Sequence, residues 1–458
     1  MRVLLINPPR YNNLPIIRED RCESIDESCV HPPTSLIYIA GVLRECGFTV
    51  CFLDANGQNL TYWSVEAWIN SFRPNWIIFR STPSTFSWDC RIVDLAVEYK
   101  AKTLMLNWNL HLLSEKVKQE SPHLDVYMND YHYENLIPSI FLEEIPTQLK
   151  TKDLPKPAWD LIPSFKPYYT RSSSLSPWVV VRGSKGCPFQ CEFCIDADTG
   201  WFPRSPHLIG DELEYLVKTR KVPYISFFDN TFEIDKGWCI EIIKEIKKRR
   251  LKFKWFINSR ADLICKHGLS FFKQLKSAGC DGSSIGIEFG SQEMLDASNK
   301  GTTVEEGLEA IKILRKAGIK SFVSCMIGYL NETREQMEQT KNFILKSKPN
   351  SFQINLTVPY RGTKLYSKCY SQGLIESLNW NELSYVPTEY ERELVLSELT
   401  YKELNELRQK FYRKLYYDPK TLLSNFAWII KHPSDLNLGV HYLSENVKRL
   451  KNKMLYSH

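Results

Sequence analysis

The sequence predicts an α/β protein with a doubly wound parallel sheet in front, a partial barrel behind it and a helical extension at the end. Three observations support this prediction. The chain has 458 residues, short apolar runs alternate with helical periods in two stretches, and an irregular segment separates those stretches. The length suggests about three domains. Strand–helix alternation is typical of crossover units, which build parallel sheets.

Residues 1–145 give the first alternation, which predicts a Rossmann-like domain. The expected strands are 2–6, 49–55, 75–79 and 102–107, and the expected helices are 34–47, 62–72 and 84–101. Ligands of doubly wound sheets bind at the carboxyl ends of the strands. Here those ends read "NPPR", "DANG", "RSTPST" and "NWNLH".

Residues 146–176 are rich in Pro, Ser and Lys and show no periodicity. We interpret them as a linker that wraps one domain onto the next.

Residues 177–374 give the second alternation. The expected strands are 178–183, 224–229, 254–260, 283–290, 321–328 and 352–360. Six strands with intervening helices, such as 303–317, predict a partial (β/α)6 barrel. In such barrels the chemistry gathers at the carboxyl ends of the strands. Residues 375–458 are expected to form a helical C-terminal domain, in which 401–417 is the clearest amphipathic run.

Composition and charge limit the classes of partner, compartment and substrate that we expect. The net charge of +6 is small beside 59 basic and 53 acidic residues, so it does not favour a nucleic-acid partner. No segment approaches the ~20 apolar residues of a membrane span. The 13 cysteines are odd in number and mostly scattered, which favours a reducing cytoplasm. An aromatic content of 13% favours a small apolar or aromatic molecule as substrate.

Three of the cysteines stand apart from the rest. Cys187, Cys191 and Cys194 have the spacing Cys-x-x-x-Cys-x-x-Cys and follow the first expected barrel strand. A structural zinc site needs four ligands. The nearest further candidates, Cys239 and His207, do not have a zinc-finger spacing.

An iron–sulfur cluster can instead use three thiolates of one tight loop and leave one iron open for a substrate or cofactor. Gly186 before the first cysteine permits close backbone approach, and Pro188 after it sets a turn. These residues favour the cluster over zinc.

The motif, with the aromatic Phe193 before its last cysteine, resembles the signature of the radical S-adenosylmethionine superfamily. Further likeness is to its branch with an N-terminal cobalamin-binding domain and covers nearly the whole chain. It rests on residues 31–56, 227–235, 258–263, 286–303, 326–336, 356–366 and 411–426.

The resemblance implies an oxygen-sensitive enzyme. Cys187, Cys191 and Cys194 would hold a 4Fe-4S cluster, and the methionine part of S-adenosylmethionine would bind the fourth iron. A donor such as flavodoxin or ferredoxin would supply the electron that cleaves this cofactor to a 5′-deoxyadenosyl radical, which abstracts hydrogen from a small molecule. Cobalamin-dependent methyl transfer to carbon is the implied reaction. The alternatives are a cobalamin-independent cyclisation, rearrangement or C–C bond formation, and a non-catalytic iron–sulfur protein.

The resemblance also implies roles for residues at the strand ends. Phe193 would lie against the adenine of S-adenosylmethionine, and Asp229 and Asn230 would contact its amino group. Glu288 and Arg260, at the ends of the fourth and third barrel strands, would bind the ribose, the methionine carboxylate or substrate. The alternative for these two is a mutual structural ion pair, since buried charges need partners.

The front domain departs from the family pattern in two places. It has no Asp-x-His-x-x-Gly motif, and "NWNLH" (107–111) and "MNDYHYEN" (128–135) replace the family's glycine-containing turns. Trp108 and Tyr131 would fill the space that those glycines leave for the cobalamin tail. The sequence therefore predicts that cobalamin binds weakly, or not at all without substrate.

Overall fold

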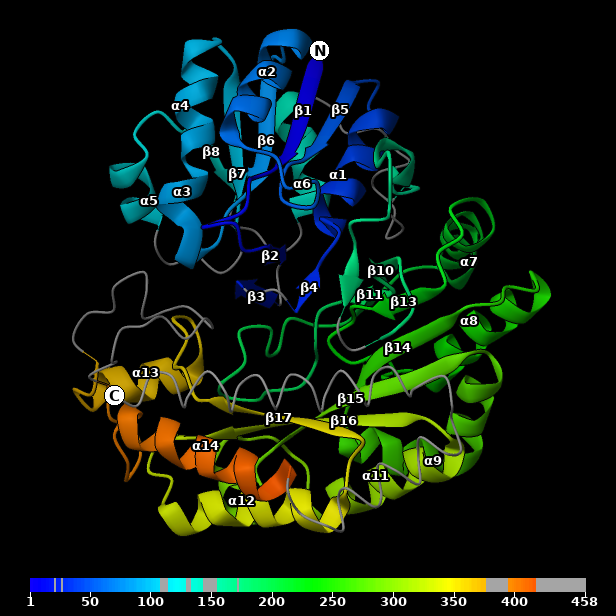
Figure 1. The fold of residues 1–458 in the computed structure, drawn as a ribbon, viewed down its shortest axis with the longest axis vertical. Helices are drawn as coiled ribbons and strands as arrows, with labels where there is room; N and C mark the ends of the chain where they lie inside the picture. Colours follow the sequence, from blue (N-terminus) through cyan, green and yellow to red (C-terminus); the bar gives the residue numbers. More distant parts are fainter. Residues whose placement is uncertain are drawn as a thin grey trace.

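A computed structural model describes residues 1–19, 22–25, 28–107, 114–128, 133–142, 155–170, 173–375 and 394–416. It contains two large parallel sheets, one formed by residues of the first predicted alternation and one by residues of the second. In Figure 1 the front sheet lies above the second sheet, and β2, β3 and β4 lie between them. The predicted α/β class, with a doubly wound domain followed by a partial barrel, is confirmed.

The front sheet has the strand order β5-β1-β6-β7-β8, and all four pairings are parallel. Its strands are β1 (Arg2–Asn7), β5 (Thr49–Asp54), β6 (Trp76–Arg80), β7 (Lys102–Leu106) and β8 (Val126–Met128). Its helices are α1 (Thr34–Glu45), α2 (Tyr62–Phe72), α3 (Phe86–Asp89), α4 (Arg91–Glu98), α5 (Ser114–Glu120) and α6 (Tyr133–Phe141). The order reverses between β1 and β6, so the crevice between them is the topological switch point where such sheets bind ligands.

The second sheet has the order β10-β13-β14-β15-β16-β17, again parallel throughout. Its strands are β10 (Trp178–Val181), β13 (Tyr224–Phe227), β14 (Lys254–Ser259), β15 (Cys280–Glu288), β16 (Lys320–Ile327) and β17 (Ser351–Leu356). The helices are α7 (Pro206–Glu214), α8 (Lys236–Lys248), α9 (Ala261–Ser277), α10 (Gln292–Ala297), α11 (Val304–Ala317), α12 (Arg334–Ser347), α13 (Lys364–Ser371) and α14 (Tyr401–Tyr416). Each of the six predicted barrel strands is present.

Local sequence signals account for the helix that was predicted at 303–317. The side chain of Thr303 accepts a hydrogen bond from the backbone N–H of Glu306, whose own side chain accepts from the N–H of Thr303. This capping box satisfies two backbone donors that a helix start leaves free. Gly318 ends α11 in the left-handed conformation, which a glycine adopts at little cost.

The segment between the two sheets is irregular but firmly packed in its described part. It contributes β9 (Tyr169–Thr170), which pairs antiparallel with β4 (Cys29–Val30) of the front part. Trp159 and Tyr168 of this segment are almost fully buried. One hydrophobic core runs from α1 through these side chains to β10, so the segment joins the two sheets instead of acting as a loose spacer.

Buried polar contacts reinforce that junction. The hydroxyl of Tyr38 in α1 donates to the carboxylate of Glu212 in α7 at 3.0 Å and accepts from Arg204 at 2.6 Å. The indole N–H of Trp159 donates to the same carboxylate at 2.7 Å. Because every charge in this group is buried beside an opposite charge or a hydrogen-bond partner, the junction favours one relative position of the two sheets.

Some expectations lie partly outside the described residues. The helical C-terminal domain is represented by α14, while residues 376–393 and 417–458 are not described. The domain boundaries at 145, 176 and 374 stay a prediction. No helix in the described part of the chain is long and apolar enough to cross a membrane.

Candidate active site

The three cysteines lie on one loop at the carboxyl end of β10. The short strands β11 (Ser184–Lys185) and β12 (Phe202–Pro203) pair antiparallel and close the loop at its base. Inside it, the backbone N–H of Cys194 donates to the carbonyl of Cys191 at 3.1 Å. A Cβ on Gly186 would lie 2.5 Å from the carbonyl oxygen of Gly200, so this tight closure requires glycine.

The three thiols are free, and burial raises the pKa of two of them. Cys191 is buried, and Cys187 and Cys194 are partly buried. Burial raises the pKa of Cys187 and of Cys194, and the neighbouring Cys191 thiolate raises both further. Thiolates are the metal-binding form, so metal binding here must release protons.

The donor set of the loop suits an iron–sulfur cluster. Three thiolates on one loop can bind three irons of a 4Fe-4S cluster and leave the fourth open, so the chemistry of Cys187, Cys191 and Cys194 fits such a cluster. Within the described residues, which include all three cysteines, no three His, Cys, Asp or Glu side chains converge as ligands of one metal ion.

The cysteine loop is anchored on neighbouring elements. The backbone N–H of Glu192 donates to the carbonyl of Ser298 at 3.0 Å, and the amide of Asn299 donates to the carbonyl of Gln190 at 2.9 Å. The N–H of Leu365, in α13, donates to the carbonyl of Glu192 at 2.9 Å. These bonds fix the backbone on both sides of Cys191.

Arg260 follows β14 and contacts the cysteine loop directly. Its Nη1 lies 3.6 Å from the Sγ of Cys191, and its guanidinium carbon lies 3.7 Å from the ring centroid of Phe189. Its Nε donates to Asp262 at 3.1 Å, and its Nη2 donates to the carbonyl of Lys300 at 2.7 Å. The alternative of a mutual ion pair between Arg260 and Glu288 is therefore wrong, because Arg260 pairs with Asp262 and Glu288 with Lys300. The predicted binding of a cofactor or substrate by these two residues stays a prediction.

Glu288 ends β15 and pairs with Lys300, a residue that the sequence analysis did not single out. The Nζ of Lys300 lies 2.9 Å from the Oε1 of Glu288 and 5.9 Å from the ring centroid of Phe193. Burial lowers the pKa of Lys300, but the Glu288 and Cys191 charges outweigh it and raise the pKa overall. Lys300 is therefore an ammonium ion facing the cysteine loop.

The backbone around Glu288 is adapted to this pair. Glu288 has φ +64°, a left-handed conformation that costs a non-glycine residue on the order of 1–3 kcal/mol. The β15–β16 register is irregular between Gly286 and Glu288. A Cβ on Gly286 would lie 2.4 Å from the Glu288 carboxylate and 3.0 Å from the Lys300 ammonium. Strain of this kind clusters at functional sites.

Asp229 and Asn230, after β13, have different hydrogen-bonding roles. The fully buried carboxylate of Asp229 accepts from the N–H of Gly183 at 3.0 Å and from the hydroxyl of Ser184 at 2.5 Å. It thereby holds the backbone that leads into the cysteine loop. The buried Nδ2 of Asn230 has no partner among the described residues, so this donor is available for a ligand. Contact of either residue with a cofactor stays a prediction.

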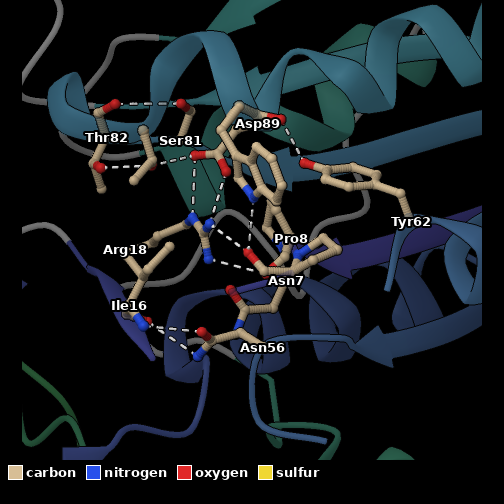
Figure 2. A network of polar contacts seen from close by, with 12 residues as sticks. Asn7, Pro8, Ile16, Arg18, Asn56, Tyr62, Ser81, Thr82 and Asp89 are labelled. Atoms are coloured by element: carbon tan, nitrogen blue, oxygen red, sulfur yellow. Dashed lines mark hydrogen bonds and ion pairs between the residues drawn. The ribbon is translucent and has the colours of Figure 1, made fainter. Parts of the chain in front are cut away.

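The switch point of the front sheet carries a second polar network (Figure 2). Arg18, on the hairpin of β2 (Ile16–Glu19) and β3 (Cys22–Ile25), is buried and donates to Asp89 at 2.7 Å. It also donates to the carbonyls of Pro8 and Pro9, both at 3.0 Å. Thr85 donates to the same aspartate at 2.6 Å. These groups therefore satisfy one another's hydrogen bonds within the protein.

The Arg18–Asp89 pair itself offers no free polar group to a cobalamin, because both side chains have partners within the protein. The remaining candidate positions follow β7 and β8, where Trp108 and Tyr131 were expected to fill the tail's space. Those two residues lie outside the described residues, so the prediction of weak cobalamin binding is untested.

Comparison with known proteins agrees with this geometry. Residues 181–344 match the radical SAM superfamily. An uncharacterised methyltransferase of Pyrococcus horikoshii is 25% identical over 96% of this chain and 99% of its own length. The anaerobic magnesium-protoporphyrin IX monomethyl ester cyclase of Cereibacter sphaeroides is also 25% identical, over 84% of this chain and 68% of the cyclase.

A solved structure has a similar fold. It is the radical S-adenosylmethionine methyltransferase TsrM from Kitasatospora setae with cobalamin and a 4Fe-4S cluster bound. The likeness has a TM-score of 0.63 at 15% identity and covers 81% of this chain and 78% of that one. It supports the order of a doubly wound front domain and a partial barrel.

A buried carboxyl group beneath Arg260 gives a prediction about stability. Oε1 of Glu233 accepts from the backbone N–H of Arg260 at 3.0 Å, and Oε2 has no partner. Burial raises the pKa of Glu233 from 4.5 to about 8, so the folded protein binds a proton there that the unfolded chain releases above pH 4.5. This contribution to stability is complete below pH 4.5 and is lost as the pH rises to about 8.

We therefore expect Glu233→Gln to reduce the loss of stability between pH 5 and 8. The free energy of unfolding of the native chain should fall by up to about 1.4 kcal/mol per pH unit more steeply than that of the variant. Chemical denaturation at several pH values measures this. Part of the slope should remain, because burial also raises the pKa of Glu332 to about 8. The exposed control is Glu305→Gln. If the free energy of unfolding of Glu233→Gln fell with pH as steeply as that of this control, Glu233 would ionise as an ordinary carboxyl group.

Proposed function

Because the chain is a radical SAM enzyme and belongs to that superfamily, we propose that it transfers a methyl group to an unactivated carbon of a small molecule with the help of cobalamin. The observation that carries the proposal is the three-thiol loop at the carboxyl end of β10, faced by the Glu288–Lys300 pair and by Arg260. A relative that is named as a methyltransferase matches this chain over almost its whole length, which supports methyl transfer as the reaction class.

Within this proposal the protein's own residues have separate tasks. Cys187, Cys191 and Cys194 hold a 4Fe-4S cluster and leave one iron for S-adenosylmethionine. When bound, the cluster supplies the electron that cleaves this cofactor to a 5′-deoxyadenosyl radical. Phe193 packs against the adenine, and Glu288 accepts hydrogen bonds from the ribose hydroxyls.

Two further positions complete the proposed binding site. The unpartnered amide of Asn230 donates to the methionine part of the cofactor. Asp229 positions the backbone at Gly183 and acts on the cofactor through the loop. A small-molecule substrate, an electron donor such as flavodoxin or ferredoxin, and a cytoplasmic location belong to the same proposal.

A second reaction has support of its own. Radical cyclisation or another C–C bond formation without cobalamin would use the front domain as a scaffold. The buried Arg18–Asp89 pair at the described switch point favours a reaction without cobalamin, and the name of the cyclase among the relatives favours cyclisation. A non-catalytic iron–sulfur protein would need neither the strained Glu288 nor its partner Lys300.

The first prediction here concerns the role of Glu288. In the cluster-loaded protein with the cluster kept oxidised, so that S-adenosylmethionine binds but is not cleaved, Glu288→Gln should weaken its binding by about ten- to a hundredfold, since one hydrogen bond to a charged group is worth roughly 1.5–3 kcal/mol. Anaerobic titration calorimetry measures the dissociation constant. The control is Glu335→Gln, an exposed change on α12 that should leave affinity unchanged. Equal affinity in both variants would make Glu288 a structural residue.

The second prediction separates the two reactions. The anaerobic protein, reduced and supplied with S-adenosylmethionine, substrate candidates and cobalamin, should form 5′-deoxyadenosine together with S-adenosylhomocysteine, the product left by methyl donation. Liquid chromatography counts both products, and cobalt analysis after gel filtration should show little cobalamin retained without substrate. The variant with all three loop cysteines changed to Ala should lose 5′-deoxyadenosine formation.

The cobalamin-free arm decides between the proposals. Formation of 5′-deoxyadenosine at an unchanged rate, with no S-adenosylhomocysteine in either arm, would favour cyclisation or rearrangement. Tight, stoichiometric cobalt retention would contradict the prediction of weak cobalamin binding and strengthen methyl transfer.

A further inference from the structure

We infer that Arg260 is a positioning residue for the cluster: by donating a hydrogen bond to the Cys191 sulfur, it raises the cluster's reduction potential. The inference rests on the proposed 4Fe-4S cluster. It differs from the expectation that Arg260 binds the cofactor or substrate.

The contacts of Arg260 point inward, to the protein. Each guanidinium nitrogen has a partner: Nε donates to Asp262 at 3.1 Å, Nη1 to the Cys191 sulfur at 3.6 Å, and Nη2 to the Lys300 carbonyl at 2.7 Å. The residue is only 5% exposed. Such a guanidinium is already held by groups of its own chain, which leaves it poorly placed to bind an incoming carboxylate.

The orientation of the guanidinium is fixed as well as its position. Its central carbon lies over Phe189, 3.7 Å from the ring centroid, and that ring belongs to the cysteine loop itself. The backbone N–H of Arg260 donates to the buried carboxyl of Glu233. The end of β14 and the loop therefore hold each other, and Nη1 is directed at the sulfur.

The positive charge of Arg260 determines its effect on the reduction potential of the cluster. Reduction adds an electron to a cluster whose thiolate ligands are already negative. A cationic N–H donor to a ligand sulfur withdraws negative charge and stabilises the reduced state, so the potential rises. The ammonium of Lys300, the next buried cation, adds to the positive field at the same thiolate, although Glu288 and Asp262 neutralise part of it.

The test compares Arg260→Met and Arg260→Lys with the native chain, each loaded with iron and sulfide under anaerobic conditions and without S-adenosylmethionine. Redox titration followed by electron paramagnetic resonance gives the midpoint potential. Met keeps the apolar contact with Phe189 but loses the donor, so the potential should become more negative. Lys keeps the charge without the forked geometry, so its shift should be smaller and in the same direction.

A matched control is Lys341→Met. Lys341 is a buried cation on the outer helix α12, paired with Glu338 and 5.5 Å from the Phe411 ring, with no contact to the cysteine loop. The midpoint potential of the cluster in Lys341→Met should equal that in the native chain. The dissociation constant of S-adenosylmethionine should change less than twofold in Arg260→Lys, since the side chain is not a ligand of the cofactor.

Three outcomes would overturn the inference. The potentials of both Arg260 variants could equal the native one at full iron content. The affinity for S-adenosylmethionine could fall tenfold or more at an unchanged potential, which would make Arg260 a cofactor-binding residue. Both variants could stay folded yet fail to hold iron, because a donor that only adjusts the potential is not needed for assembly. Failure of the native chain itself to hold a cluster would instead refute the proposed function.

Discussion

The arrangement of the site depends on how firmly one loop is held. Three thiols on a single loop can bind one cluster only if the backbone between them is fixed, because the three cysteines themselves lie outside the helices and strands. Hydrogen bonds from Glu192 to Ser298 and from Asn299 to Gln190 supply that support, together with the bond between Leu365 and Glu192. The barrel strands matter chiefly because their carboxyl ends bring these anchors to the same place.

Burial then governs the charges around the loop. A buried charge without a partner is costly, so each cation near Cys191 has its own carboxylate: Asp262 beside Arg260, and Glu288 beside Lys300. The pairs leave both cations close to the thiolate while lowering the cost of burying them. The left-handed backbone at Glu288 and the missing side chain at Gly286 adapt β15 to the second pair. The strain is located where the chemistry is proposed.

The sequence predicted the strands well because several of them are buried on two faces, which produces unbroken apolar runs such as 178–181 and 76–79. Strands β14 and β16 instead alternate between buried and half-buried positions. It missed the β2–β3 hairpin, whose place is set by Arg18 reaching an aspartate 71 residues away. It also missed Lys300, since nothing in "SNKGTT" marks a lysine that contacts a strand end 12 residues earlier. The alternative of an ion pair between Arg260 and Glu288 was wrong because Asp262 and Lys300 take these places. Local sequence patterns do not predict tertiary contacts of this kind.

The front sheet raises a related point about relatives and function. Its fold is that of enzymes with a cobalamin-binding domain, yet the described part of its switch point is occupied by a self-satisfied ion pair. A fold of this kind can keep its architecture while the site on it changes. The barrel, in contrast, retains its cysteine loop and the charged side chains that face it.

The central claim is that the loop leaves one iron open for S-adenosylmethionine. Electron–nuclear double resonance on the reduced protein, with the cofactor labelled at its amino nitrogen and carboxylate oxygen, tests this claim most directly. The account predicts hyperfine coupling of both labels to the cluster's electron spin, because both groups bind the iron that has no cysteine. Saturating labelled cofactor without any coupling would contradict it.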